Sequence, residues 1–112
     1  MSLRITGLGE EIAAVTVLPW HQSLEEWPED PSLAEKRGIS RHVVRLVRTS
    51  DAPDAEVYAV KETVSEFANR EYKILRELNK LGAPSVEPIA VVEGRKNPQG
   101  EELPCALETR FL

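Results

Sequence analysis

One long helical pattern lies between β-patterned segments, and it restricts the fold more than any other feature of this sequence. Apolar residues recur at helical spacing over Val64–Leu81. Thr63 with Glu66 predicts a capping box at the N-terminus. Gly82 predicts the C-terminal stop, and Pro84 prevents continuation because proline cannot extend a helix. We therefore expect a single helix over these residues.

Short strand patterns flank this helix on both sides. Their apolar alternation predicts strands within Glu11–Leu18, Gly38–Thr49, Val57–Glu62, Ile89–Glu93 and Leu103–Thr109. The segment Asn97–Gly100 has the residue order of a type I turn and joins the last two strands. This pattern predicts an α+β fold, a mostly antiparallel five-stranded sheet with one long packed helix.

The sequence divides into two parts by composition. Residues 1–36 form an N-terminal extension that holds one strand and an acidic loop rich in tryptophan and proline, and residues 37–112 hold the other strands and the helix. Prolines make a regular element in the loop unfavourable. We expect Trp20 and Trp27 to anchor the loop by packing; the alternative is a site where a ligand stacks on them.

Bulk properties exclude several classes of partner. The 112 residues suffice for one domain with a modest core, and the net charge of -5 argues against nucleic acid and anionic membranes as partners. No apolar run reaches the length of a membrane span, and no signal peptide is evident. Cys105 is the only cysteine, which fits a reducing cytoplasm and predicts a small core residue.

A glutamate interrupts the apolar face of the predicted helix. At about 100° per residue, one stripe contains Phe67, Ile74, Leu75, Leu78 and Leu81, and Glu71 lies near its middle. We expect this stripe to face the sheet, which would bury Glu71. A buried carboxylate without a partner destabilises the folded state by roughly several kcal/mol. The sequence therefore predicts a cation opposite Glu71.

The preceding strand offers that cation. Its alternation places Val57, Ala59 and Lys61 on one face, so Lys61 is the predicted partner of Glu71. In an arbitrary α+β domain such a pair would simply fix the helix on the sheet. Because a buried ion pair is weak evidence for stability, a functional role also has to be considered.

Two segments resemble the protein-kinase superfamily. Tyr58-Ala59-Val60-Lys61 resembles its V-A-I-K strand, and Glu71-Tyr72-Lys73-Ile74-Leu75 resembles the glutamate-centred part of its N-lobe helix. More narrowly, the blocks LPW, LEEWPED, RGISRHVVRLVR, YAVKE and REYKILRELNKLG, within residues 18–112, together resemble a bacterial kinase-like family that is catalogued only as a domain of unknown function. The resemblance implies the fold of a kinase-like N-lobe.

The resemblance implies a nucleotide site. In kinases the lysine holds the ATP phosphates and the helix glutamate holds the lysine. Carried over to this sequence, it assigns phosphate binding to Lys61 with Glu71, adenine contact to Ala59, the phosphate-covering hairpin to Gly38, the gatekeeper position to Thr109, and the hinge backbone to Arg110 and Phe111. The implied cofactor is ATP with magnesium in the full-length parent protein.

The sequence also departs from the kinase pattern. The glycine-rich loop is reduced to Gly38, with Arg41 where the last glycine would lie. The H-R-D and D-F-G segments of the C-lobe are missing, so we expect no catalysis by this chain alone. We expect a nucleotide-binding N-lobe fragment of an ATP-dependent phosphotransferase. The exposed face would then meet the missing C-lobe or self-associate.

Two other interpretations remain open at the level of sequence. The chain could be a non-enzymatic protein-binding module, with Lys61–Glu71 as a structural tie and the loop Trp20–Pro31 as the partner surface. It could also be a pseudokinase-like nucleotide binder. A metal site is not predicted, because His21 and His42 lie in different elements without ligand spacing. The acceptor of a phosphate does not follow from the sequence.

Overall fold

The computed structural model describes residues 3–7, 15–27, 44–48, 55–83 and 86–110. The elements are β1 (Arg4–Gly7), the 3₁₀ turn η2 (Leu24–Glu26), β2 (Val44–Arg48), β3 (Val57–Thr63), α3 (Ser65–Lys80), β4 (Pro88–Glu93) and β5 (Cys105–Arg110). The five strands pair antiparallel in the order β1-β4-β5-β3-β2. The predicted α+β fold with one long helix is confirmed.

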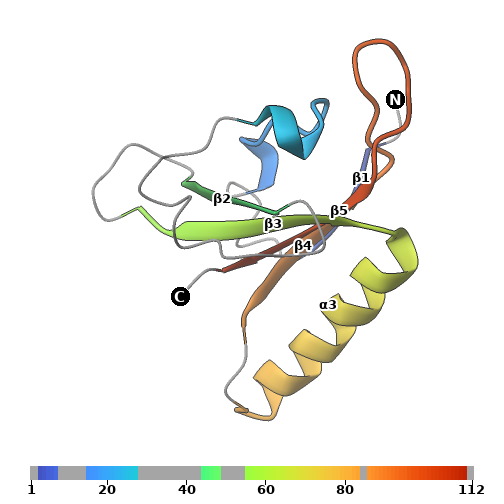
Figure 1. Ribbon diagram of the computed structural model, residues 1–112. Helices are drawn as coiled ribbons and strands as arrows, with labels where there is room; N and C mark the ends of the chain where they lie inside the picture. The colour runs from blue at the N-terminus through green and yellow to red at the C-terminus, as the bar shows by residue number, and fades with distance from the viewer. Residues whose placement is uncertain (1–2, 8–14, 28–43, 49–54, 84–85, 111–112) are drawn as a thin grey trace.

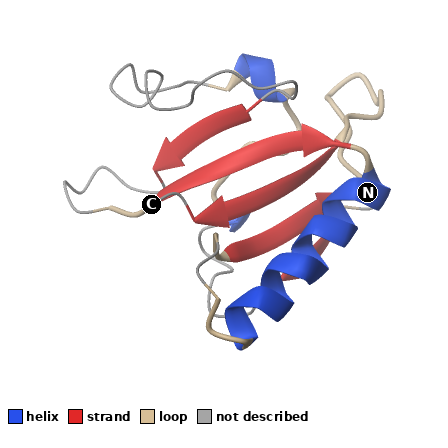
Figure 2. Ribbon diagram, turned by 60° about the horizontal axis from the view of Figure 1, so that its bottom comes forward, coloured by secondary structure: helices blue, strands red, loops and turns tan. Residues whose placement is uncertain are grey.

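The sheet lies between two layers (Figure 1). On one face α3 packs on β4 and β5, and this core contains Ala68, Tyr72, Val91, Cys105 and Leu107. On the opposite face residues 15–27 lie across the sheet and bury a second, larger cluster with Tyr58 and Val60. Figure 2 shows that α3 runs along the β4 side of the sheet and does not reach β2.

Both ends of α3 lie within one residue of the prediction, although the N-terminal cap differs. The N-cap is Val64, which makes no side-chain capping hydrogen bond, because Thr63 still belongs to β3. The predicted capping box is therefore wrong. At the other end Gly82 has φ +75°, and the amide of Ala83 donates to the carbonyl of Leu78 at 3.0 Å. This is the predicted glycine stop.

The strand predicted over Glu11–Leu18 is wrong where the structure describes it. Val15 and Thr16 are helical, and the two residues that follow lie in a turn. Val15 is 2% exposed, so this apolar segment covers the sheet instead of joining it. The fifth strand of the sheet is instead β1, which pairs with β4. Gly7 of β1 lies so close to β4 that a Cβ at this position would be 2.6 Å from the carbonyl oxygen of Ile89. Residues 11–14 lie outside the described residues.

The other four predicted strands are confirmed where the structure describes them. The turn at residues 97–100 also forms, since the amide of Gly100 donates to the carbonyl of Asn97 at 2.9 Å. No helix in the described part of the chain is long and apolar enough to cross a membrane.

The two tryptophans anchor the N-terminal segment. Trp20 and Trp27 are 5% and 4% exposed, and their rings meet edge to face at 5.2 Å between centroids. The indole Nε1 of Trp20 donates to the carbonyl of Val15 at 2.7 Å. The prediction of packing anchors is confirmed.

The helix face that meets the sheet differs from the prediction. Ala68 and Tyr72 are buried against the sheet, whereas Phe67 and Ile74 are more than half exposed. Only Val64 lies between the end of β3 and the start of α3, so the direction of the short connection fixes the rotation of the helix. The small side chain of Ala68 also permits close packing. The apolar stripe consequently lies beside the packed face of α3 and does not face the sheet.

Candidate functional site

The predicted pair of Lys61 and Glu71 forms. The ammonium Nζ of Lys61 in β3 donates to the carboxylate Oε1 of Glu71 in α3 at 2.7 Å. The side chains are 27% and 42% exposed, so the prediction that both are buried is wrong. The reason is the rotation of α3, which brings Glu71 to the margin of the packed helix face. The pair is accordingly a half-exposed ion pair that leaves the lysine open on one side.

Strand register places two further predicted residues beside Lys61. On the same face Ala59 pairs with Thr109, and Lys61 pairs with Leu107. Ala59, Lys61 and Thr109 are all partly exposed, because α3 covers β4 and β5 on this side of the sheet. The structure thus brings four predicted site residues together: Ala59, Lys61, Glu71 and Thr109.

A shallow groove continues from the ion pair along α3. Its volume is about 300 Å³, and it is lined by Lys61, Thr63, Phe67, Arg70, Glu71, Ile74 and Leu75. An ammonium group has three N–H donors, and Glu71 uses one of them. The remaining donors of Lys61 suit an anionic oxygen such as that of a phosphate. Ala59 and Thr109 do not line this groove.

Arg110 does not join this site. Its side chain lies on the opposite face, over the ring of Tyr58 at 5.5 Å, and bonds Glu87 at 2.7 Å and Glu56 at 3.0 Å. Its backbone amide already donates to the carbonyl of Glu87 at 2.9 Å. The hinge donor assigned to Arg110 is therefore engaged within the chain. Gly38 and Phe111 lie outside the described residues.

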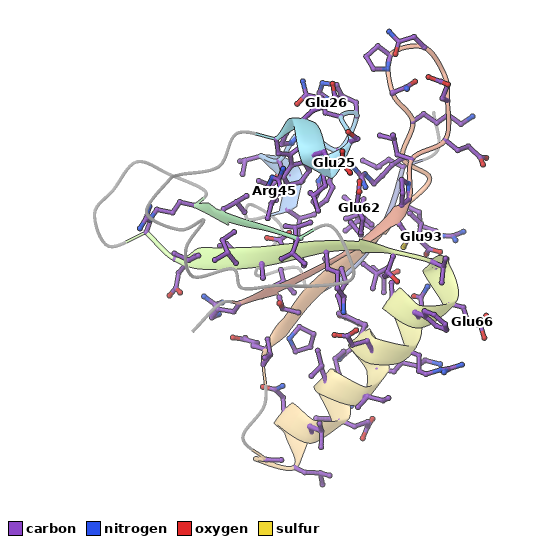
Figure 3. The ribbon with its side chains drawn as sticks, viewed as in Figure 1. Glu25, Glu26, Arg45, Glu62, Glu66 and Glu93 are labelled. Atoms are coloured by element: carbon purple, nitrogen blue, oxygen red, sulfur yellow. The ribbon has the colours of Figure 1, made fainter. Side chains whose placement is uncertain are left out.

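A buried arginine is one of two buried charged residues, with Glu108, that sequence reasoning missed among the described residues. Arg95 is 1% exposed, and its guanidinium bonds the carboxylate of Glu62 at 3.1 Å. It also donates to the carbonyls of Trp20, Gln22 and Pro104 at 2.6–3.0 Å. Figure 3 shows Glu62 between the sheet and η2. One signal was present in the sequence, because alternation in β3 puts Glu62 on the same face as the apolar Tyr58 and Val60.

Electrostatics at this end of the sheet serve the fold. Burial lowers the pKa of Arg95, and hydrogen bonding to Glu62 opposes that shift. Burial also raises the pKa of the Cys105 thiol, which is in the α3 core as predicted for a small core residue. Hydrogen bonds from Ser65 and Arg4 lower the pKa of Glu93. Among the described residues, no three His, Cys, Asp or Glu side chains gather as potential metal ligands.

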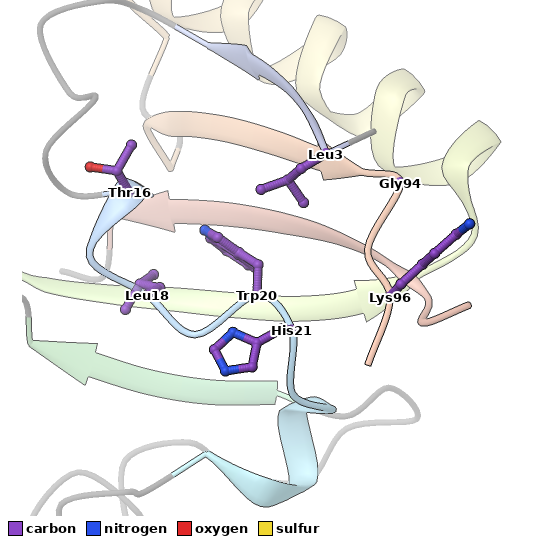
Figure 4. A pocket seen from close by; sticks show the side chains of 7 residues that line it. All are labelled: Leu3, Thr16, Leu18, Trp20, His21, Gly94 and Lys96. Atoms are coloured by element: carbon purple, nitrogen blue, oxygen red, sulfur yellow. The ribbon is translucent and has the colours of Figure 1, made fainter. Parts of the chain in front are cut away.

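A second pocket lies on the opposite face from Lys61. It has a volume of about 190 Å³, and Figure 4 shows side chains of the N-terminal segment and of the turn after β4 around it. It is lined by Leu3, Thr16, Leu18, Trp20, His21, Gly94 and Lys96. Its small size and its distance from the ion pair separate it from the candidate site.

Comparisons with family models, with curated proteins and with solved structures gave no match for this chain.

Proposed function

We propose that this chain binds the polyphosphate of a nucleotide, ATP with magnesium, on the sheet face that carries Lys61. In this proposal the chain is the N-lobe of an ATP-dependent kinase-like phosphotransferase. The observation that carries it is the Lys61–Glu71 pair at 2.7 Å, set beside the paired residues Ala59 and Thr109 on a partly open face. A lysine held by a helix carboxylate next to a small residue is the arrangement that the kinase resemblance implies.

The half exposure of the pair supports a binding role over a purely structural one. An exposed ion pair contributes about 0–1 kcal/mol to stability, so Lys61 and Glu71 add little to the fold. Glu71 instead restrains the lysine in one position, which lowers the entropy cost of binding a phosphate there. Adenine would lie on Ala59 and Thr109.

The proposal assigns no phosphoryl transfer to this chain by itself. Catalysis of that reaction depends on positioning and on magnesium charge, and the sequence contains no H-R-D or D-F-G segment to supply them. The proposed activity of the chain is therefore nucleotide binding. The chemistry of the parent protein and its phosphate acceptor belong to the same proposal and need the C-lobe.

A titration with ATP and magnesium, followed by NMR of backbone amides, tests this proposal. We expect weak binding, with Kd of about 1 mM or less, and shift changes centred on Ala59, Lys61 and Thr109. Lys61→Met should weaken binding at least about tenfold and leave the melting temperature nearly unchanged, because the pair is half exposed. Lys73→Met, a neutralised lysine on the exposed side of α3, is the matched control and should bind as wild type.

Two results would contradict the proposal. One is the absence of shift changes at these amides at an ATP concentration several times higher than about 1 mM. The other is binding that Lys61→Met and Lys73→Met weaken equally, since this would show nonspecific attraction of a polyanion. A marked loss of melting temperature in Lys61→Met without any nucleotide binding would instead support the protein-binding module, in which the pair is a structural tie.

A further inference from the structure

Three large apolar side chains, two in α3 and one at its C-cap, stay exposed although the helix packs on the sheet. Phe67, Ile74 and Leu81 are 53%, 52% and 79% exposed. They are spaced seven residues apart, so they follow one line along the helix, as a-position residues do in a coiled coil. We call this line the α3 ridge. Large apolar side chains left exposed along one line of a helix are candidates for an interaction site.

The charges that flank the α3 ridge have a self-complementary order. Arg70 precedes Ile74 by four residues, and Glu77 follows it by three, on the same flank of the helix. In an antiparallel helix pair related by a two-fold axis at Ile74, the same flank of both helices meets. Arg70 then lies beside Glu77 of the second copy, and Glu77 beside Arg70 of the second copy.

The same two-fold arrangement also matches the apolar residues. It places Ile74 against Ile74 of the second copy and Phe67 against Leu81 of the second copy, because both lie seven residues from Ile74. Arg70 now bonds Glu66 of its own helix at 3.3 Å, with both side chains more than 60% exposed. Such a pair contributes little, so Arg70 can exchange it for an interhelical partner.

We propose that a second copy of this chain docks on the α3 ridge as an antiparallel, two-fold symmetric helix pair. The opposite charges of Arg70 and Glu77 sum to zero, so this flank of the helix does not favour a partner of strong net charge. Their order instead complements the same flank of a second copy. One helix pair buries less than a standard interface, which makes the dimer weak and reversible. Phe67, Arg70 and Ile74 also line the groove beside Lys61, so a nucleotide bound there would compete with the second copy, and the dimer is tested without nucleotide.

Sedimentation velocity of the full chain, from about 20 µM to about 500 µM, tests this proposal in a range that suits a weak interface. We expect a concentration-dependent shift from monomer to dimer. Ile74→Asp places two like charges at the axis and should remove the dimer. Lys73→Glu reverses a charge on another side of α3 and, as the matched control, should leave association unchanged.

A charge exchange tests the orientation of the helices. Arg70→Glu and Glu77→Arg each put like charges opposite one another and should each weaken the dimer, by about fivefold or more. The double variant restores opposite charges and should recover dimerisation. A chain that stays monomeric at about 500 µM overturns the proposal. So does a dimer that Ile74→Asp leaves intact, a double variant without recovery, or assembly beyond the dimer.

Discussion

At the scale of single residues, Arg95 connects more of the molecule than any residue singled out from the sequence. It lies two residues after β4, yet its guanidinium reaches the carboxylate of Glu62 in β3 and three backbone carbonyls. The amide of Leu24 donates to the same carboxylate at 3.0 Å. Arg95 and Glu62 thereby fix the N-terminal segment on the sheet.

Arg95→Met should be strongly destabilising. The change leaves Glu62 in a buried position without its cation, and removing one partner of a buried pair costs about 3–5 kcal/mol. Urea denaturation measures this as a lower midpoint at an unchanged slope. Lys96→Met, one residue further along and exposed, should change the free energy of unfolding by less than about 0.5 kcal/mol.

The double variant Arg95→Met with Glu62→Gln refines this prediction. Because it removes the stranded charge, it should be less destabilised than the sum of the two single variants. If Arg95→Met and Lys96→Met have the same urea midpoint, the guanidinium of Arg95 does not fix the N-terminal segment on the sheet.

At the scale of elements, Glu93 joins three of them. It ends β4, accepts hydrogen bonds from Arg4 of β1, and accepts one from the hydroxyl of Ser65 at the start of α3. Figure 3 shows Glu93 close to the first turn of the helix. A negative charge at a helix N-terminus also interacts favourably with the helix dipole. These contacts lower the pKa of Glu93, with the bond from Ser65 as the largest cause.

The lowered pKa predicts a pH-dependent stability. A carboxylate whose pKa is lower in the folded state stabilises the fold above its unfolded value, near 4.5 for Glu93. That contribution is lost as the pH falls from there through the folded pKa. As the pH falls through this range, we expect the free energy of unfolding to decrease less in Glu93→Gln than in the wild type. The measurement is the free energy of unfolding at successive pH values. Glu66→Gln, the control, removes an exposed carboxylate in the first turn of α3 and should keep the wild-type dependence of stability on pH.

An unchanged pH profile in Glu93→Gln would contradict this role. Arg4→Met gives a second check, because it removes only the bond from β1 and keeps that from Ser65. It should reduce the acid destabilisation in part, since the larger cause of the pKa shift remains.

At the scale of the whole molecule, the N-terminal segment and the sheet share one core. The larger cluster combines Val15, Trp20, Leu24 and Trp27 with side chains of β2, β3, β4 and β5. Burial of this kind couples the segment to the rest of the fold. The division at residue 36 that composition suggests is therefore crossed by contacts of the described residues.

We expect the segment and the sheet to unfold together. Both tryptophans lie in the segment, so tryptophan fluorescence reports its unfolding, whereas far-UV circular dichroism reports mainly α3 and the sheet. In urea the two transitions should coincide, as they do for a two-state domain. A fluorescence transition at clearly lower urea than the dichroism transition would show that the segment is an independent unit.

The sequence by itself determined the features that arise from neighbouring residues. Strand alternation put Ala59 and Lys61 on one face, and Gly82 ended the helix, because both effects depend on backbone geometry within a few residues. The partner of Glu71 was also predicted, because β3 offers Lys61 close to the start of α3, although the burial from which the pair was argued is wrong. These local requirements gave the α+β fold and the central pair of the candidate site.

Only the tertiary structure decided which surfaces are covered. The apolar stripe through Phe67 and Ile74 suits burial on any helical wheel, but the short connection from β3 turns Ala68 and Tyr72 toward the sheet. The same rotation leaves Lys61 and Glu71 half exposed. Likewise, Arg95 is buried because a segment more than seventy residues away folds over it. Sequence periodicity cannot predict such burial, because it depends on long-range packing.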